Sequence, residues 1–191
     1  MIFQRNAAAQ PPEEAQESRP TWVESLYDWA EAALVALVVV VVLFAFVFRV
    51  VSVDGDSMLP NLETGDRLLL NCINYTPERG DIVVVNRYTK EPLVKRIIAV
   101  EGDIIDIKDG LVYLNGVALD ETFLDPNNAV TPSKEFVGPA QVPAGHVFVI
   151  GDNRSDSHDS RYADIGFVSV KDSVGVAVFR IWPFNRLGVP T

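Results

Sequence analysis

The sequence predicts a mainly β domain that follows one N-terminal transmembrane helix. Two observations support this prediction. Residues 32–48 read AALVALVVVVVLFAFVF, without a charged side chain. After residue 50, short apolar runs rich in β-branched residues alternate with turn sequences such as Asp109-Gly110 and Asn115-Gly116. This alternation is typical of β-sandwiches and β-barrels.

The N-terminal region divides into a tail, a lead-in and a membrane span. Residues 1–21 are polar and acidic and contain several prolines, so we expect a disordered tail. Residues 22–49 hold an amphipathic helical lead-in, Trp22–Glu31, and then the span, Ala32–Phe48. The aromatic side chains of the lead-in suit the level of the lipid headgroups. The span lies at the short end of the range of about 17–25 residues that cross a bilayer.

Two alternatives to a permanent anchor are a buried helix of a soluble protein and a cleavable leader. A buried soluble helix ordinarily keeps a polar face, which this run lacks. A leader has a shorter apolar region and a small-x-small cleavage site, whereas Arg49-Val50-Val51-Ser52 follows here. We therefore expect a permanent anchor, although Lys and Arg are too scarce on both flanks to give its orientation.

Residues 50–191 are predicted to form the β domain, with 118–143 as a long proline-bearing excursion from its sheet. His146 is expected to start a strand. The predicted strands are Arg67–Ile73, Ile82–Asn86, Leu93–Val100, Ile104–Ile107, Leu111–Leu114, Val147–Ile150 and Val174–Ile181.

Composition narrows the classes of function. The net charge of −10 argues against binding to nucleic acid. The single cysteine, Cys72, excludes an internal disulfide, and we expect a buried thiol within a strand. His146 and His158 lack the spacing of a zinc hydrolase, and the carboxylates of residues 151–161 miss the EF-hand pattern. We therefore expect no metal and no cofactor.

Two polar positions could carry acyl-transfer chemistry. Ser57 follows Gly55-Asp56 on a predicted turn, where a nucleophile has free backbone N–H groups nearby. Lys95 and Arg96 are adjacent on an apolar strand and point to opposite faces. Either cation could be solvated, but a desolvated lysine loses its proton near neutral pH and arginine does not. If one of them is catalytic, it is Lys95.

The segment Gly151–Arg161 is the third polar cluster, with the sequence GDNRSDSHDSR. Asp159 and Arg161 are close enough in sequence to pair, and Asp152 could pair with Arg96. Such a loop would brace a site rather than perform chemistry.

The order of these clusters resembles the bacterial type I signal peptidases. The shared motifs are Ser-Met-x-Pro after a membrane span, Lys-Arg on a strand, and Gly-Asp-Asn-Arg-x-x-Ser-x-Asp-Ser-Arg. The resemblance runs from Ala32 to Arg186 and includes Arg79–Val83, Glu101–Asp103 and Arg180–Arg186. It implies a signal-peptidase-type β-sheet or barrel domain, anchored by a single pass on the outer face of the bacterial plasma membrane. It also implies cleavage of signal peptides from preproteins after small residues at −1 and −3, close to the lipid bilayer and the secretion translocon.

The resemblance also implies roles for individual residues. Ser57 is the nucleophile, Lys95 the general base and Ser157 the serine that orients the lysine. Asp159 with Arg161, and Asp152 with Arg96, are the bracing ion pairs. The resemblance also implies a substrate groove beside Ser57, lined by a strand from Val53 to Asp56, by Met58 and by the start of the strand that carries Lys95. Its lining residues are Val53, Asp54, Gly55, Asp56, Met58, Leu93 and Val94.

Several positions depart from the family pattern. Gly55 stands where the two-span form has a serine that assists the oxyanion hole, so the chain resembles the single-span, Gram-positive-like form. Asn61 replaces the usual threonine, and Ala99 and Glu101 replace a glycine and a proline. None of these changes removes a catalytic group.

Three other functions share part of these features. A self-cleaving repressor-type Ser/Lys protease would lack the span and the Gly151–Arg161 loop. A membrane-tethered β module that only binds would not need Ser57, Lys95 and Ser157 together. A processor dedicated to a few substrates, such as pilins, is left open by the motifs.

Overall fold

The computed structural model describes residues 22–73, 75–86 and 92–190, so the predicted tail lies outside the described residues. The chain divides after Val42 into two compact units, and the second carries the strands. The helix α1 runs without interruption from Trp22 to Val47, which joins the predicted lead-in and span in one element. Its segment Ser25–Val47 is long and apolar enough to cross a membrane. At 1.5 Å per residue it measures about 35 Å, against about 30 Å of hydrocarbon.

The prediction that Phe48 ends the membrane helix is wrong. Phe48 begins strand β1, Phe48–Ser52, which pairs antiparallel with β2, Arg67–Asn71, from Phe48–Asn71 to Ser52–Arg67. Because this strand continues the apolar run of the helix, composition alone does not separate the two elements. The β domain therefore begins two residues earlier than expected.

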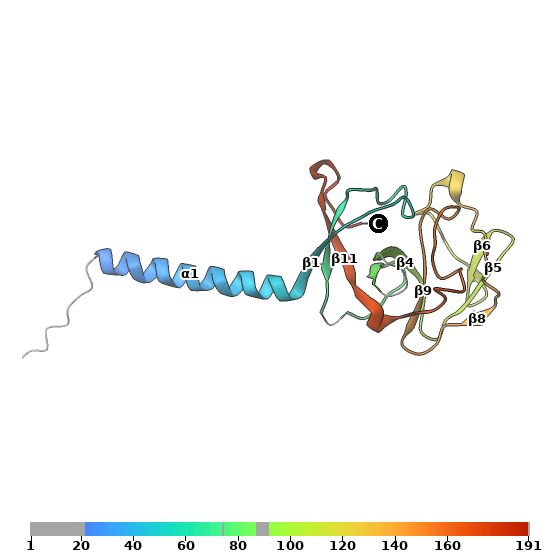
Figure 1. Ribbon diagram of the computed structural model, residues 1–191, viewed down its shortest axis with the longest axis horizontal. Coiled ribbons are helices and arrows are strands. Elements are labelled where there is room, and N and C mark those ends of the chain that lie inside the picture. The colour runs from blue at the N-terminus through green and yellow to red at the C-terminus, as the bar shows by residue number, and fades with distance from the viewer. Residues whose placement is uncertain (1–21, 74, 87–91, 191) are drawn as a thin grey trace, which may run out of the picture. The chain divides into compact units, whose positions relative to one another are not determined.

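The domain is mainly β, as predicted, and its sheets are antiparallel (Figure 1). The larger sheet has the order β1-β2-β11-β3-β4-β9-β10. Its other strands are β3 Ile82–Val85, β4 Leu93–Val100, β9 His146–Ile150, β10 Val168–Ser169 and β11 Ser173–Trp182. The smaller sheet has the order β7-β6-β5-β8, with β5 Ile104–Lys108, β6 Leu111–Leu114, β7 Val117–Ala118 and β8 Ala140–Gln141. Short 3₁₀ helices lie at Pro126–Asn128, Val170–Asp172 and Phe184–Arg186.

All seven predicted strands are present, but several details of the prediction are wrong. The strands predicted at Arg67–Ile73 and Ile82–Asn86 end at Asn71 and Val85. Cys72 was expected to be a buried thiol within a strand, but it is half-buried just beyond β2. Residues 53–56 form no strand, because the chain leaves the sheet after Ser52. There Val53 exchanges backbone hydrogen bonds with Asp66 and Gly65 instead. Gly55 then adopts a φ of 93°, which an extended strand does not allow.

The excursion 118–143 supplies β8, an edge strand of the smaller sheet. This sheet lies at the end of the domain opposite β1 and β11 (Figure 1). Phe136 of the excursion packs against Phe148 of β9, which also contacts Phe167. The excursion is thus part of the packed domain.

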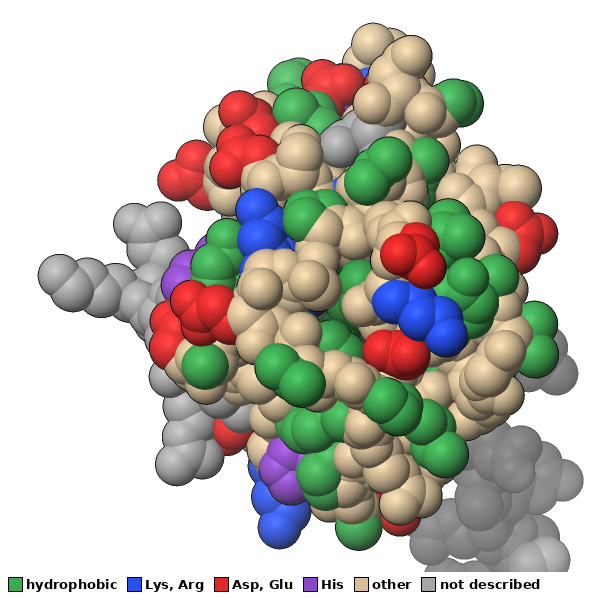
Figure 2. Space-filling model, turned by 90° about the vertical axis from the view of Figure 1, so that its right-hand side faces the viewer, with side chains coloured by type: hydrophobic (Ala, Val, Ile, Leu, Met, Phe, Trp, Pro, Cys, Tyr) green, Lys and Arg blue, Asp and Glu red, His purple; other side chains and the backbone are tan. Residues whose placement is uncertain are grey.

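Hydrophobic, acidic and basic side chains are interspersed over the face of the domain seen in Figure 2.

Strand β4 contributes to all three clusters of the hydrophobic core. Val94 belongs to the first cluster, Ile98 to the second and Ile97 to the third. Its neighbours are β3 and β9, so both edges of the strand are paired. The side chains from Val94 to Ala99, which include Lys95 and Arg96, are buried.

Candidate active site

Ser57 lies on a turn that is fixed on both sides. Before the turn, strand β1 ends at Ser52. After it, the next residue, Met58, is buried in the first core cluster and anchors the turn. The carbonyl oxygen of Ser57 accepts a hydrogen bond of 2.9 Å from the backbone N–H of Asn153. The side chain of Asn153 donates to the carbonyl oxygen of Asp56 at 3.1 Å. The polar loop after β9 therefore holds the turn that carries the serine.

Lys95 reaches this serine from the middle of β4. Its side chain is 2% exposed. Its Nζ lies 2.7 Å from Ser57 Oγ and donates a second hydrogen bond of 3.0 Å to the Val94 carbonyl oxygen. A nucleophile in hydrogen-bond contact with a base is the arrangement that acyl transfer requires.

Burial lowers the pKa of Lys95 from 10.5 to about 8. Desolvation is the largest cause, since the charged form loses its hydration. The charges of Asp159 and Asp152 raise this pKa, and the charge of Arg161 lowers it. A lysine with this pKa is neutral in an appreciable fraction of molecules near neutral pH, and the neutral amine can accept a proton.

Arg96 is buried as well, so both cations of the Lys-Arg pair are desolvated. The Arg96 guanidinium binds the Asp152 carboxylate with two bonds, Nε to Oδ1 at 2.8 Å and Nη2 to Oδ2 at 2.7 Å. The register explains the contact, because Arg96 pairs with Ile150 at the end of β9 and Asp152 follows two residues later. The structure thus brings Arg96 and Asp152 together across 56 residues of sequence.

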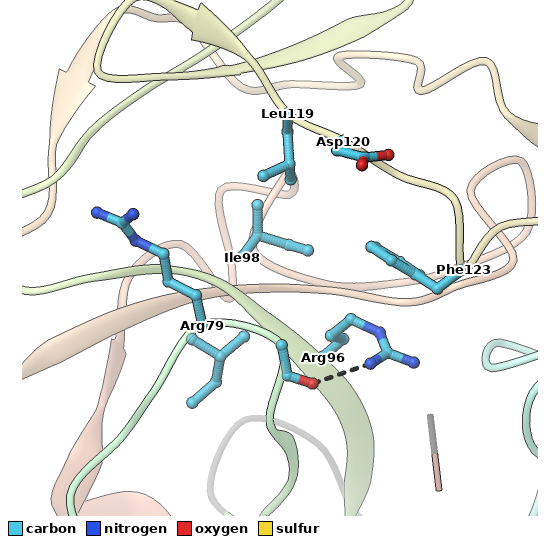
Figure 3. Close-up of a pocket in the computed structure, with 8 residues that line it drawn as sticks. Arg79, Arg96, Ile98, Leu119, Asp120 and Phe123 are labelled. Carbon is cyan, nitrogen blue, oxygen red and sulfur yellow. Dashed lines mark hydrogen bonds between the residues drawn. The ribbon is translucent and has the colours of Figure 1, made fainter.

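A pocket of about 200 Å³ lies beside Arg96 (Figure 3). In this view the Arg96 guanidinium donates to the Gly80 carbonyl, and Phe123 lies above it. The distance from the guanidinium carbon to the ring centroid is 4.4 Å. Neither Ser57 nor Lys95 lines this pocket, so it is separate from the serine and the lysine.

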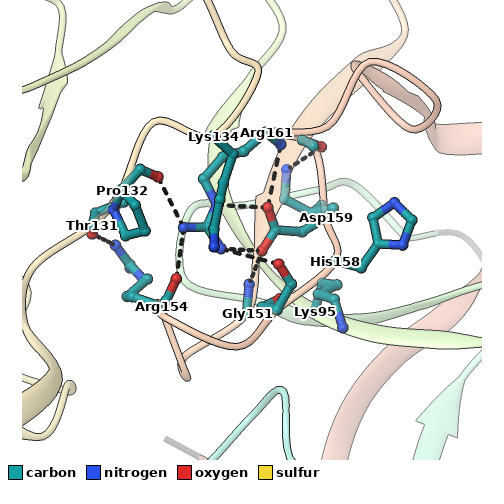
Figure 4. A network of polar contacts seen from close by, with 12 residues as sticks. Lys95, Thr131, Pro132, Lys134, Gly151, Arg154, His158, Asp159 and Arg161 are labelled. Atoms are coloured by element: carbon teal, nitrogen blue, oxygen red, sulfur yellow. Dashed lines mark hydrogen bonds and ion pairs between the residues drawn. The ribbon is translucent and has the colours of Figure 1, made fainter.

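Arg161 is the centre of a second buried network (Figure 4). It binds both carboxylate oxygens of Asp159 at 2.8 Å and donates to the carbonyl oxygens of Arg154 and Pro132. Burial is the largest influence on the pKa of Asp159 and raises it. The bonds from Arg161 and from the Gly151 N–H together outweigh it and lower the pKa. Asp159 is therefore an anion at neutral pH and faces Lys95 as a fixed negative charge.

Ser157 is buried in the same loop. Its hydroxyl has no well-formed hydrogen bond to the described residues, although it lies close enough to Asp159 to help lower the pKa of that carboxyl. Among the described residues, the Ser157 hydroxyl therefore makes no hydrogen bond to Lys95. A side chain at Gly151 would collide with the Ser157 side chain and with the Ser57 carbonyl. The glycine thus allows the loop to pack directly against the turn that carries Ser57.

The residues implied to line a substrate groove divide into two groups. Asp54, Gly55 and Asp56 are exposed, and Leu93 is half-buried. By contrast, Val53, Met58 and Val94 lie in the first core cluster, where they support the turn from below. The Gly55 N–H donates to Thr64 Oγ1 at 3.0 Å.

A third buried ion pair and a link through Asn61 were not predicted from the sequence. Arg154 is fully buried and contacts Glu121 and Thr131 of the excursion. The Asn61 side chain donates to Asp152 and to the Phe123 carbonyl. Arg154 belongs to a recognised motif, but the excursion offers no periodic signal that would mark Glu121 as its partner.

The sequence is similar to known proteins along most of its length. Residues 26–182 match the family model described as signal peptidase, peptidase S26. A signal peptidase I crystal structure from Enterococcus faecalis V583 is 31% identical, with a TM-score of 0.45, over 53% of this chain and 97% of that chain. Signal peptidase I of Bacillus caldolyticus is 40% identical over 164 residues, which are 80% of this chain and 89% of the relative. Signal peptidase I S of Bacillus subtilis (strain 168) is 37% identical over 86% of this chain and 93% of the relative. On the family match and these two sequence relatives, the chain belongs to the signal peptidases of peptidase family S26.

Proposed function

We propose that the protein is a serine endopeptidase that removes N-terminal signal peptides from exported preproteins, with Ser57 as nucleophile and Lys95 as general base. The observation that carries this proposal is the 2.7 Å contact between Lys95 Nζ and Ser57 Oγ. The lysine is buried, and its pKa is lowered to about 8. The membership in the signal peptidase family supplies the class of substrate.

The proposed reaction begins with transfer of the Ser57 proton to neutral Lys95. Ser57 Oγ attacks the scissile carbonyl, and the Ser57 N–H stabilises the oxyanion. Among the described residues that N–H has no bonded acceptor, so it is free for this role. Lys95 then protonates the departing amine, and water releases the signal peptide from the acyl-enzyme. Asp159 and Arg161 hold the loop that packs against the reacting pair.

The proposed substrates carry small residues at −1 and −3. The exposed residues 54–56, together with Leu93, are proposed to contact the signal peptide beside Ser57. We further propose that α1 anchors the protein in the bacterial plasma membrane by a single pass. Its N-terminus would be cytoplasmic and its β domain extracytoplasmic, near the translocon. Such an anchor confines the enzyme to the plane that its substrates occupy, which raises their effective concentration.

The test is cleavage of a preprotein by the full-length protein in detergent. Ser57→Ala, Lys95→Ala and Lys95→Arg should each abolish cleavage while the β domain keeps its circular dichroism spectrum. The Arg variant is inactive because its guanidinium stays protonated. Lys108→Arg, an exposed lysine on β5, serves as the matched control and should cleave normally. A folded and active Lys95→Arg enzyme would rule out the base role. A preprotein with a bulky residue at −1 should not be cut.

A further inference from the structure

The side chain of Asn61 connects three segments that surround the reacting pair. Its Nδ2 donates a hydrogen bond of 2.8 Å to Asp152 Oδ2 and one of 3.0 Å to the Phe123 carbonyl oxygen. Both partners are acceptors, so the orientation of the amide follows from chemistry. Asn61 lies four residues after Ser57, Asp152 lies on the polar loop, and Phe123 lies in the excursion.

Together with Arg96, these residues form a closed ring of contacts, in which Arg96, Asp152, Asn61 and Phe123 follow one another. The Arg96 guanidinium holds the Asp152 carboxylate from one side and lies under the Phe123 ring (Figure 3). Asn61 connects the same carboxylate to the same phenylalanine from the other side. Since Arg96 follows Lys95 on β4, the ring ties the turn of Ser57 to the strand of Lys95.

We infer that Asn61 is a positioning residue, which aligns Ser57 with Lys95 by joining the nucleophile's turn to the Arg96–Asp152 pair and to the excursion. The inference rests on the proposed function for its readout. A threonine at this position has one hydroxyl donor, whereas the Asn61 amide donates to both partners. The amide is thus able to hold the excursion and the carboxylate at once.

The backbone of residue 61 has its own supports, which a side-chain substitution leaves in place. Its carbonyl oxygen accepts bonds from Arg180 Nη1 at 2.8 Å and from Arg186 Nη2 at 3.2 Å. A substitution at this position therefore tests the side chain alone. Asn115 provides a matched control, because its Nδ2 donates to Asp103 Oδ1 at 2.9 Å beside Arg79, with the same three residue types.

The first experiment compares Asn61→Asp with Asn115→Asp by the pH dependence of preprotein cleavage. The introduced carboxylate adds negative charge beside Asp152, one of three charged groups, with Asp159 and Arg161, that act on Lys95. A nearby negative charge favours the protonated lysine, so the rising limb of the rate should move to higher pH by about one unit. The alkaline plateau should stay below that of wild type, because a carboxylate donates neither hydrogen bond of the Asn61 amide. Asn115→Asp should leave both the limb and the plateau unchanged. A wild-type plateau in a folded Asn61→Asp enzyme would overturn the inference.

A second variant, Asn61→Ala, decides the matter if Asn61→Asp does not fold. Misplacement of a reacting group can cost about 10²-fold in rate. We therefore expect kcat to fall at least tenfold, by that measure, with little change in KM. A kcat equal to that of Asn115→Ala would overturn the inference.

Acylation of Ser57 by an activated ester, followed by intact mass spectrometry, separates this inference from the proposed function. If the wild-type protein cuts no preprotein, the proposed function fails. The effect of Asn61→Ala on the acylation rate still tests the positioning role. An acylation rate equal to wild type in the folded variant counts against that role.

Discussion

The domain contains two arginine–aspartate pairs that share their composition but differ in their environment. Arg96 binds Asp152 and Arg79 binds Asp103, each through two nitrogen–oxygen contacts. An asparagine amide donates a further hydrogen bond to each carboxylate. The side chains of the first pair are 5% and 0% exposed, whereas those of the second are 48% and 8% exposed.

This difference predicts that burial, rather than residue type, sets how much each pair contributes to stability. Removal of one partner from a buried pair strands an uncompensated charge, at a cost of about 3–5 kcal/mol. A pair in which one partner is solvated, as Arg79 is, contributes about 0–1 kcal/mol. The buried pair is also the one that adjoins Lys95, the proposed general base, on β4, so its loss should affect activity as well as stability.

The largest effect is therefore expected from Arg96→Met. The change leaves the fully buried Asp152 without its counter-ion, and we expect the free energy of unfolding to fall by about 3–5 kcal/mol. Preprotein cleavage should also be lost. Urea unfolding in detergent measures the change, with Arg79→Met as the matched control at about 1 kcal/mol or less. Equal losses in the two variants would break the comparison.

Lys95→Met should have the next largest effect, and in the opposite direction. The folded pKa of Lys95 is about 8, below the ordinary 10.5, so the folded state disfavours the charged lysine. This penalty is complete below pH 8 and disappears as the pH rises from about 8 to 10.5. The inactive variant should therefore be more stable than wild type at pH 7, by a few kcal/mol at about 1.4 kcal/mol per pKa unit.

The pH dependence of this gain identifies its origin. The advantage of Lys95→Met should shrink as the pH approaches 10.5, because unfolded wild-type lysine then also loses its proton. Lys108→Met, at an exposed position on β5, should show no such trend. A gain that is independent of pH would mean that improved packing, rather than charge, stabilises the variant.

Glu121→Gln should have a smaller effect, since the amide oxygen of glutamine can still accept the hydrogen bond from Arg154. Arg154 is fully buried and would lose its counter-ion, but it would keep Thr131, at 2.7 Å from Nη1. We expect a loss of about 1–3 kcal/mol in the free energy of unfolding. Glu135→Gln, an exposed glutamate of the same excursion, is the control. No difference between the two would show that water replaces Glu121 at Arg154.

The sequence predicted local structure well where a pattern was local. The β-branched run Leu93–Val100 became β4 with the same bounds, because apolar residues on both faces specify a buried strand. By contrast, β1 continues the apolar run of α1, and only its pairing with β2 identifies it as a strand. The expected strand at Val53–Asp56 was wrong because Gly55 and the backbone bonds to Gly65 and Asp66 turn the chain away.

The motifs predicted which residues belong to the candidate site, but not how these residues pack and bond. Ser57 and Lys95 were named from the sequence, and the structure puts them in contact. The burial of Met58 and Val94, and the bond from Asn61 to Asp152, depend on how segments as far as 91 residues apart pack together. Such long-range contacts leave no periodic signal in the sequence.

The smallest effect, that of Arg79→Met, should depend on acid. Burial raises the pKa of Asp103 most, but the bonds from Arg79, Asn115 and the Val100 N–H together lower it below its ordinary value. An aspartate with a lowered pKa stabilises the fold above about 3.8 and loses that contribution as the pH falls through its folded value. The variant should therefore be less stable than wild type at pH 6, by about 1 kcal/mol or less. At pH 2 the two should converge, because the protonated carboxyl no longer distinguishes them. A difference that persists at pH 2 would instead assign the contribution of Arg79 to its aliphatic chain.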